Sequence, residues 1–279
     1  MLQQVQKKSQ FWQHSTIMEL NGKTVWITGA SSGIGAALAV ALSVKGCSLI
    51  LSARRREQLQ EVAGQCHTKA MIVVMDVSDQ KSIIGAWQEI QASGGMPDIL
   101  INNSGISQRS AALETQLETD RRIMEVNYFG AVTLTKLVAP YLVQKGSGMI
   151  VNISSLSGKF GWKLRSSYAA SKFALLGFFE SLRAELEGSG VEVLNVIPGR
   201  IRTEIAQHAV LGDGSAYAKS DRGQETGIPV EVCAGKIVRA MKKNKKEIVI
   251  ARIDGLMIHI RYWMPWLYYR IAAKRDPNK

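Results

Sequence analysis

The fold of this chain is decided by the stretch Thr24-Val-Trp-Ile-Thr-Gly29-Ala-Ser-Ser-Gly-Ile-Gly35. Its first five residues predict a short apolar strand, and a helix with small alanine side chains follows the last glycine. Glycine permits a tight turn and a close approach of the backbone to a pyrophosphate, whose charge suits a helix N-terminus. Strand, glycine turn and helix in this order are the context of a dinucleotide fingerprint. The spacing Gly-x-x-x-Gly-x-Gly is not the more familiar G-x-G-x-x-G, and a glycine turn without a ligand is the alternative.

Further apolar segments alternate with helical patterns from residue 24 to residue 252. They predict strands at 24–28, 48–53, 70–77, 98–103, 149–155, 191–197 and 247–251, a long helix over 117–145 and another from Tyr168 to about Glu187. Strands that are apolar almost throughout indicate a parallel sheet covered on both faces. No polar or proline-rich linker interrupts the pattern, so we expect one α/β domain over 18–252 with a doubly wound Rossmann fold.

A second motif, Tyr168-Ala-Ala-Ser-Lys172, stands thirteen residues after Ser155. The spacing of four places Tyr168 and Lys172 on one helix face, one turn apart. A phenol has an unperturbed pKa near 10, and a neighbouring ammonium is expected to lower the pKa of Tyr168 toward neutrality. Ser155 ends a predicted buried strand, so its hydroxyl faces the crevice where α/β sheets bind ligands. This set can give a proton to a carbonyl oxygen while a cofactor supplies a hydride.

The order of these motifs, with Asn102-Asn103-Ser104-Gly105, Asn127 and Pro198-Gly199 between and after them, resembles the short-chain dehydrogenase/reductase family over roughly 21–252. The resemblance implies about seven strands and a catalytic set of Asn127, Ser155, Tyr168 and Lys172. Lys172 is then expected to hold the nicotinamide ribose as well, and Asn127 to position a water that links Lys172 to solvent.

The second strand ends in Leu51-Ser-Ala53-Arg54-Arg55, with no acidic residue. A carboxylate there would hold the ribose 2′-hydroxyl of NAD, whereas a guanidinium suits the 2′-phosphate of NADP. In the family, Ala53 stands where NAD-preferring members often carry Asp, so we expect NADP(H), with Arg54 on the phosphate. The alternative is that these arginines are the solvated start of a helix, as Arg56 is expected to be. The predicted cofactor-binding residues are Gly29, Ser31, Ser32, Gly33, Ile34, Gly35, Arg54, Arg55, Asp76, Val77, Asn103, Gly105, Tyr168, Lys172, Pro198, Gly199, Ile201 and Thr203.

These residues predict an NADP(H)-dependent oxidoreductase that interconverts a carbonyl and a secondary or primary alcohol, with Tyr168 as general acid/base. The apolar C-terminal segment favours a hydrophobic, lipid- or steroid-like substrate. The alternative is an NADP(H)-binding sensor or scaffold without significant turnover, which the complete catalytic set disfavours.

The net charge of +12 is spread along the chain apart from Arg54-Arg-Arg56 and the lysines of 242–246. No nucleic-acid-binding module accompanies this charge, so we expect no nucleic-acid partner. Three isolated cysteines and four scattered histidines predict neither a disulfide framework nor a metal site, and suit a reducing, cytoplasmic location. By the resemblance, a homodimer or homotetramer forms through the helices that carry Asn127 and Tyr168.

Three segments lie outside the motifs. Residues 1–17 are polar and Gln-rich and are expected to be a poorly ordered extension. Residues 201–228 show no clear period and are expected to form a substrate loop. Residues 253–279 mix aromatic and basic side chains at helical spacing, interrupted by Pro265. Two interpretations of 253–275 stay open: a helix on a membrane surface, or packing on this chain or a sister subunit.

Overall fold

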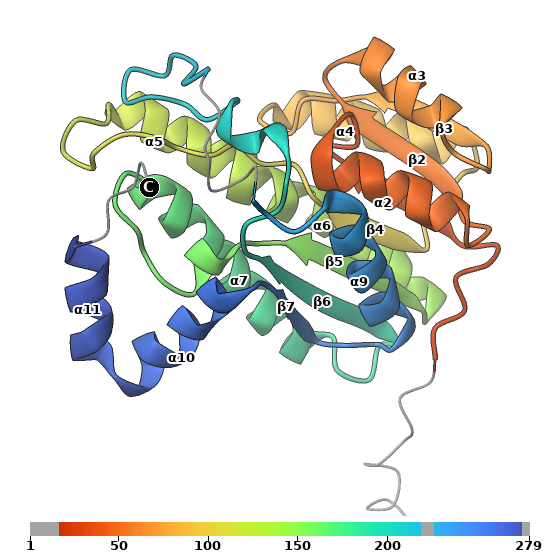
Figure 1. The fold of residues 1–279 in the computed structure, drawn as a ribbon. Coiled ribbons are helices and arrows are strands. Elements are labelled where there is room, and N and C mark those ends of the chain that lie inside the picture. Colours follow the sequence, from red (N-terminus) through yellow and green to blue (C-terminus); the bar gives the residue numbers. More distant parts are fainter. Residues whose placement is uncertain (1–16, 219–225, 275–279) are drawn as a thin grey trace, which may run out of the picture.

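The computed structural model describes residues 17–218 and 226–274, and its centre is one parallel sheet (Figure 1). The sheet has seven strands in the order β3-β2-β1-β4-β5-β6-β7. Their bounds are β1 Thr24–Thr28, β2 Ser48–Ala53, β3 Ala70–Val74, β4 Ile99–Asn102, β5 Gly148–Ile153, β6 Val191–Pro198 and β7 Glu247–Ile250. The strand order reverses between β1 and β4, so the prediction of a doubly wound, seven-stranded Rossmann fold is confirmed.

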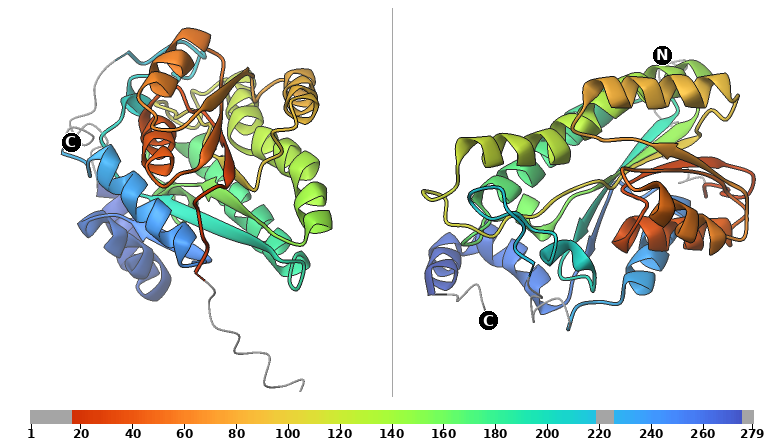
Figure 2. Two further views of the ribbon diagram at one scale, coloured as in Figure 1. Left: turned by 90° about the vertical axis from the view of Figure 1, so that its right-hand side faces the viewer. Right: turned by 90° about the horizontal axis from the view of Figure 1, so that it is seen from above.

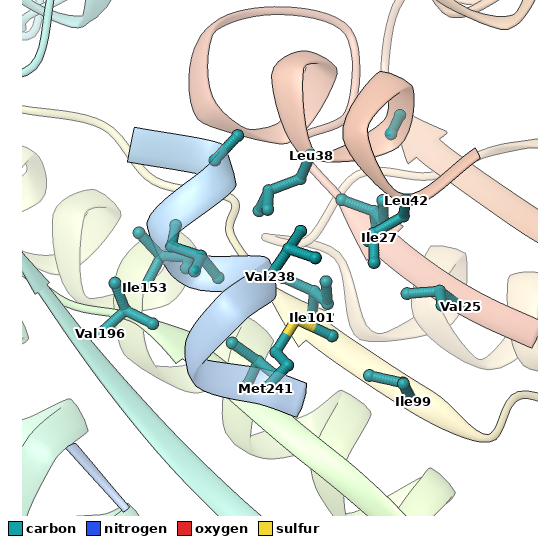
Figure 3. Packing of buried hydrophobic residues seen from close by; sticks show 14 of the residues in the cluster. Val25, Ile27, Leu38, Leu42, Ile99, Ile101, Ile153, Val196, Val238 and Met241 are labelled. Atoms are coloured by element: carbon teal, nitrogen blue, oxygen red, sulfur yellow. The ribbon is translucent and has the colours of Figure 1, made fainter. Parts of the chain in front are cut away.

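Helices cover both faces of the sheet (Figure 2). On one face lie α2 (Gly33–Ser43), α3 (Arg56–Gly64) and α9 (Val230–Lys242), and their apolar side chains form one core cluster with the strands. Figure 3 shows α9 and α2 meeting over the strands through Val238, Met241, Leu38 and Leu42. The other face carries α4 (Gln80–Ala92), α6 (Gly130–Lys145) and α7 (Ser166–Glu185), with a second cluster that includes the fully buried Trp26.

The predicted long helix over 117–145 is wrong in one respect. It is divided into α5 (Leu117–Met124), a π-helical turn η2 (Glu125–Phe129) and α6. Directly after the π turn, Gly130 passes close to the loop after β3, since a Cβ there would lie 2.5 Å from the carbonyl oxygen of Val77. The π turn contains the buried Asn127, and such turns occur frequently at functional sites.

Three buried asparagines cross the middle of the sheet. Asn102, Asn152 and Asn195 are register partners on β4, β5 and β6. Asn102 Nδ2 donates to Asn152 Oδ1 at 2.9 Å, and Asn152 Nδ2 donates to Asn195 Oδ1 at 3.2 Å. Asn102 also donates to Thr135 Oγ1 of α6, so this amide ladder fastens three strands and one covering helix.

The segment after β7 continues as a short turn η5 (Ile253–Gly255) and two helices, α10 (Leu256–Trp263) and α11 (Pro265–Lys274). Pro265 divides them as predicted and opens the second helix, a position that tolerates its missing N–H. The predicted N-terminal extension lies outside the described residues, apart from residue 17, and the substrate loop is described over 201–218 and 226–228. In the described part, the loop contains one short 3₁₀ turn, η4 (Glu204–Ala206).

Candidate active site

A cleft of about 450 Å³ opens at the carboxyl ends of the central strands. Because these strands are parallel, the turns after β1, β2, β4, β5 and β6 all reach this edge. The cleft brings together most of the predicted site residues: Gly29, Ser31, Ser32, Gly33, Ile34, Arg54, Arg55, Asp76, Val77, Asn103, Gly105, Ser155, Tyr168, Lys172, Pro198, Gly199, Ile201 and Thr203. Gly35 and Asn127 do not line it.

The glycine turn has the geometry that an anion requires. Gly29 and Gly33 have positive φ angles of 62° and 56°. Gly35 lies beneath the turn, where a Cβ would be 2.3 Å from the carbonyl oxygen of Gly29, so its role is close packing. Ser32 caps α2 without a side-chain hydrogen bond, and the first helical turn has no acidic residue. The N–H groups of this turn and the positive end of the helix dipole therefore fit a pyrophosphate.

Arg54 and Arg55 form the far wall of the cleft, directly after β2. Both side chains are exposed, and Arg55 is the N-cap residue of α3. Among the described residues no acidic side chain forms an ion pair with Arg54. Asp76, which lines the same region, accepts from the backbone N–H and the hydroxyl of Ser78 at 2.9 and 2.7 Å. The Arg54 guanidinium is thus available to an anionic group at this end.

Asn103 fastens the turn after β4 to the glycine turn. Its Nδ2 donates to the carbonyl oxygens of Thr28 and Gly29 at 2.9 and 3.1 Å. Thr28 Oγ1 in turn accepts from the backbone N–H groups of Asn103 and Ser104. Asn103 therefore shapes the floor of the cleft between β1 and β4, where the strand order reverses.

The segment after β6 crosses the opposite side of the glycine turn. Pro198 ends β6, and Ile201 is buried and bridges to Ile228. A Cβ on Gly33 would lie 3.4 Å from Thr203 Cγ2, so Thr203 stands directly over the start of α2. This placement agrees with the predicted contact of residues 198–203 with a bound dinucleotide.

Ser155 and Tyr168 both line the cleft, and the Ser155 hydroxyl is close enough to the Tyr168 phenol to influence its pKa. Ser155 Oγ also accepts from the backbone N–H of Ser157 at 3.1 Å, which leaves its own proton to donate. Tyr168 is buried, and this burial raises the pKa of its phenol, against the lowering effects of the Ser155 hydrogen bond and the positive charge of Arg165.

The expected influence of Lys172 on this pKa is therefore not what the structure shows. Lys172 Nζ lies 5.9 Å from the centre of the Tyr168 ring and donates to the carbonyl oxygen of Ile153 at 2.9 Å. Burial lowers the pKa of Lys172 from 10.5 to about 8, so its ammonium gives up a proton more readily than that of an exposed lysine. The predicted lowering of the Tyr168 pKa is therefore wrong here, because burial raises this pKa and the influences that oppose burial come from Ser155 and Arg165 and not from Lys172.

Asn127 sits behind the cleft wall in the π turn. Its Oδ1 accepts from the backbone N–H of Ile106 at 2.8 Å, and its Nδ2 donates to the carbonyl oxygen of Ile106 and to Ser171 Oγ. Gly105 separates it from Lys172, since a Cβ there would lie 3.2 Å from Asn127 Oδ1 and 3.4 Å from Lys172 Nζ. Asn127 thus fixes the strand-end loop to the helix that carries Tyr168.

A buried glutamine that the sequence analysis did not identify holds the start of that helix. Gln108 Oε1 accepts from the backbone N–H groups of Ser167 and Tyr168 at 2.8 and 3.2 Å. Its Nε2 donates to the hydroxyl of Ser110 and to two further hydroxyls, and its side chain has no exposed surface. This role depends on a contact with Tyr168, sixty residues later in the sequence, so no local motif around Gln108 predicts it.

The remaining wall of the cleft comes from the loop over the site and from the π turn. It contributes apolar side chains and a few polar ones. These further lining residues are Ile106, Val126, Ile205, Val210 and Ala216, with Arg122, Glu204 and His208. Arg122 and Val126 are four residues apart across α5 and η2, a spacing that could have identified them once the helix was placed.

Among residues 17–218 and 226–274, no three His, Cys, Asp or Glu side chains gather to form a possible metal site. None of the helices in these ranges combines the length and apolar character needed to cross a membrane.

Comparison with known proteins places this geometry in a family. A family model described as short chain dehydrogenase matches residues 23–213. A mosquito protein, Dehydrogenase/reductase SDR family protein 7-like of Anopheles gambiae, is 40% identical over 265 residues, which are 92% of this chain and 84% of that protein. Dehydrogenase/reductase SDR family member 7B of Bos taurus is also 40% identical, with 90% and 80% of the two chains covered.

Solved structures agree. A short-chain dehydrogenase from Streptomyces avermitilis superimposes with a TM-score of 0.79 at 29% identity, covering 93% of this chain and all of that one. A short-chain dehydrogenase from Sphingobium yanoikuyae in complex with NADPH gives a TM-score of 0.73 at 25% identity, covering 92% and 98%.

Proposed function

This chain belongs to the short-chain dehydrogenase/reductase family of oxidoreductases, and on that premise we propose that it uses NADP(H) to interconvert a carbonyl and an alcohol on a hydrophobic substrate. The observation that carries the proposal is the single cleft in which the glycine turn, Arg54 and the Ser155–Tyr168 pair meet. A sensor without turnover would need the first two of these features but not the third.

The preference for NADP(H) is supported by the charge at the end of β2. Arg54 offers a planar set of donors that suits a 2′-phosphate, and Ala53 supplies no carboxylate to repel it. Ser31, Ser32 and Ile34 belong to the turn that would hold the pyrophosphate, and residues 198–203 would hold the nicotinamide end. When bound, the nicotinamide supplies or accepts the hydride.

The protein's own residues then handle the oxygen and its proton. Ser155 donates to a substrate carbonyl oxygen and orients it, and Tyr168 gives that oxygen its proton. Burial keeps the Tyr168 phenol protonated at neutral pH, which suits the reducing direction. Lys172, whose pKa is lowered to about 8, can exchange a proton near neutrality and would replace the one that Tyr168 gives up through a water between them.

Asn127 is proposed as a positioning residue. Both of its amide protons are used on Ile106 and Ser171, and Oδ1 keeps one lone pair beyond its bond to Ile106. That lone pair could hold the water expected between Lys172 and solvent. The amide itself keeps the loop after β4 in register with α7.

A hydrophobic substrate is supported by apolar side chains in the lining of the cleft. Ile106, Val126, Ile205 and Val210 supply this surface. The polar residues Arg122 and His208 lie in the same wall, where they could meet a polar end of the substrate.

Assembly as a homodimer or homotetramer is part of the proposal. Two aromatic side chains, Phe129 beside α6 and Phe173 on α7, are each 46% exposed, and Val143 on α6 is 40% exposed. Exposed apolar residues on these two helices support a subunit contact there. Light scattering of the purified protein measures the mass directly, and a monomer at all concentrations would exclude this assembly.

Thermal unfolding with NADPH, NADH or neither tests the cofactor assignment without a substrate. A ligand at about 100 times its Kd adds about 2.7 kcal/mol, so we expect a clear rise in Tm with NADPH and little with NADH. Arg54→Gln should remove the NADPH effect, whereas the control Arg56→Gln, outside the cleft, should not. Equal stabilisation by NADH would overturn the choice of NADP(H).

Turnover separates the enzyme from the sensor. Apolar ketones are screened for NADPH oxidation, with Tyr168→Phe as the matched control because it removes only one hydroxyl. We expect that variant to lose about 10²–10⁴-fold in kcat while keeping the NADPH shift in Tm. Equal activity in wild type and Tyr168→Phe would refute the assignment of Tyr168.

A further inference from the structure

The turn between α10 and α11 exposes an unusual amount of aromatic surface. We define the aromatic turn as Tyr262, Trp263, Met264, Trp266 and Tyr269. Their side chains are 78%, 80%, 41%, 65% and 58% exposed. Tryptophan and tyrosine are large side chains that a water-facing surface seldom gathers in one place without a partner. In Figure 1 this turn lies at the edge of the molecule, away from the sheet.

The exposure is not caused by loose packing of the segment. The Tyr268 ring is 4% exposed and lies 6.1 Å from Phe160 and 6.3 Å from Trp162, and its hydroxyl donates to the carbonyl oxygen of Gly161. Met257 is buried in the same cluster as Phe160. One face of the segment is therefore docked on its own chain, and this docking turns Trp263 and Trp266 outward. Packing on the same chain, one of the two interpretations left open, explains the buried face only.

The charges around the aromatic turn are mostly positive. Residues 253–274 contain Arg261, Arg270 and Lys274 and a single acidic residue, Asp254, whose carboxylate accepts from the backbone N–H of Arg252. The Arg261 guanidinium lies over the rings of Tyr268 and Tyr269, at 5.5 and 5.3 Å from their centres. Aromatic rings with interleaved Arg and Lys are typical of surfaces that lie in the headgroup layer of an anionic membrane.

The dimensions also suit a surface contact. The two helices have 8 and 10 residues, so each is about 12–15 Å long, against about 30 Å for the hydrocarbon core of a bilayer. We propose that the aromatic turn docks this protein on an anionic lipid surface, with Trp263 and Trp266 among the headgroups and Arg270 and Lys274 beside the lipid phosphates. This is peripheral attachment, and the predicted cytoplasmic location stays a prediction beside it.

The anchor of this surface is close to the catalytic residues along the chain. Residues 160–163, on which Tyr268 packs, connect the strand end that carries Ser155 to the helix that carries Tyr168. Lys163 Nζ donates to the carbonyl oxygen of Ala273, which adds a second tie between the loop and α11. The loop 160–163 would thus support the aromatic turn on a lipid surface and also join the strand end of Ser155 to the helix of Tyr168.

The test is flotation of the full chain with vesicles of phosphatidylcholine alone or with about one third phosphatidylserine. We expect binding to the anionic vesicles that falls as salt is raised, and at least about tenfold weaker binding for Trp263→Ala with Trp266→Ala. The matched control truncates two exposed aliphatic residues elsewhere, Leu113→Ala with Ile84→Ala, and should bind as wild type does.

A second pair of variants isolates the charge. Arg270→Gln with Lys274→Gln should lower binding by about tenfold or more, since each basic residue near an anionic surface contributes about fivefold. Lys45→Gln with Lys245→Gln has the same net charge and should change binding little. All variants should unfold within a few degrees of wild type, because the altered side chains are exposed.

Three results would overturn the proposal. The first is wild-type binding by the tryptophan variant, and the second is no binding by the wild type. The third is a wild-type dimer in light scattering that becomes a monomer only in the tryptophan variant, since the aromatic turn would then be a contact between two copies of this chain.

Discussion

Replacing Lys172 by methionine gives the sharpest physical test of the site, because the cost of burying its ammonium depends on pH in a calculable way. Burial lowers the pKa of Lys172 from 10.5 to about 8. Between these values the unfolded chain binds more protons than the folded one, so the free energy of unfolding rises with pH in this window. With one pKa unit worth about 1.4 kcal/mol, the folded state carries a penalty of about 3 kcal/mol at pH 7 and about 1 kcal/mol at pH 10.

The assay is chemical unfolding of wild type and Lys172→Met at several pH values from 7 to 10. Other titrating groups are common to both proteins, so the difference between them isolates Lys172. We expect the wild type to gain about 2 kcal/mol relative to Lys172→Met across this range. In Lys172→Met the carbonyl oxygen of Ile153 also loses its hydrogen-bond donor, which adds to the difference in unfolding free energy at every pH. Only the change of this difference with pH therefore reports on the titration of Lys172.

Lys136→Met is the control, since Lys136 is exposed on α6. Its difference from wild type should stay constant between pH 7 and pH 10. A constant difference for Lys172→Met as well would refute the reasoning, because it would mean that Lys172 titrates alike in the folded and unfolded chains.

Three other predictions concern packing and position. Gly35→Ala places a Cβ 2.3 Å from a backbone oxygen and should lower the unfolding free energy by about 1–3 kcal/mol. The control Gly85→Ala lies in open space within α4 and should leave stability unchanged or raise it by up to about 1 kcal/mol. Thermal unfolding measures both. Gln108→Ala removes two bonds to the start of α7 and should lower stability by about 1–3 kcal/mol and kcat more than KM, so a change in KM alone would refute its role in placing Tyr168. Asn152→Ala breaks the amide ladder and should cost about 2–4 kcal/mol in denaturant unfolding, and a cost below about 0.5 kcal/mol would show that the ladder contributes little.

The strands could be predicted well because each is an apolar run bounded by turn residues. The predicted strands at 24–28 and 48–53 match β1 and β2, and the others differ by up to three residues at an end. The largest difference is at β3, which ends at Val74 rather than residue 77. There the chain leaves the sheet to form the cleft, and Asp76 turns to bond Ser78. A local pattern of apolar residues does not contain that information.

The site could be predicted where a short sequence motif itself indicates the chemistry, as for the glycine turn and the Tyr168 motif. It was not predictable where the answer depends on distant contacts. The close approach of Gly130 to Val77 joins segments about fifty residues apart, and the direction of the Tyr168 pKa arises from burial. Neither the spacing of four nor the pattern of the helix reports how much water the folded site excludes.

The C-terminal segment shows the same division. Helical spacing and Pro265 were sufficient to predict a helical segment with a kink or break at the proline, but not which face would be docked. That depends on Phe160 and Trp162, about a hundred residues earlier in the chain, which pack against Tyr268.

The amide ladder has a consequence for how the sheet assembles. Asn102, Asn152 and Asn195 come from strands separated by about fifty residues of chain, and each is matched to the next only in one alignment. If one strand shifted by a single residue, its side chains would exchange faces, and a buried amide would meet aliphatic helix surface with no partner. The ladder therefore favours the observed alignment of β4, β5 and β6 over shifted ones, and this alignment also sets the position of Ser155, two residues beyond β5.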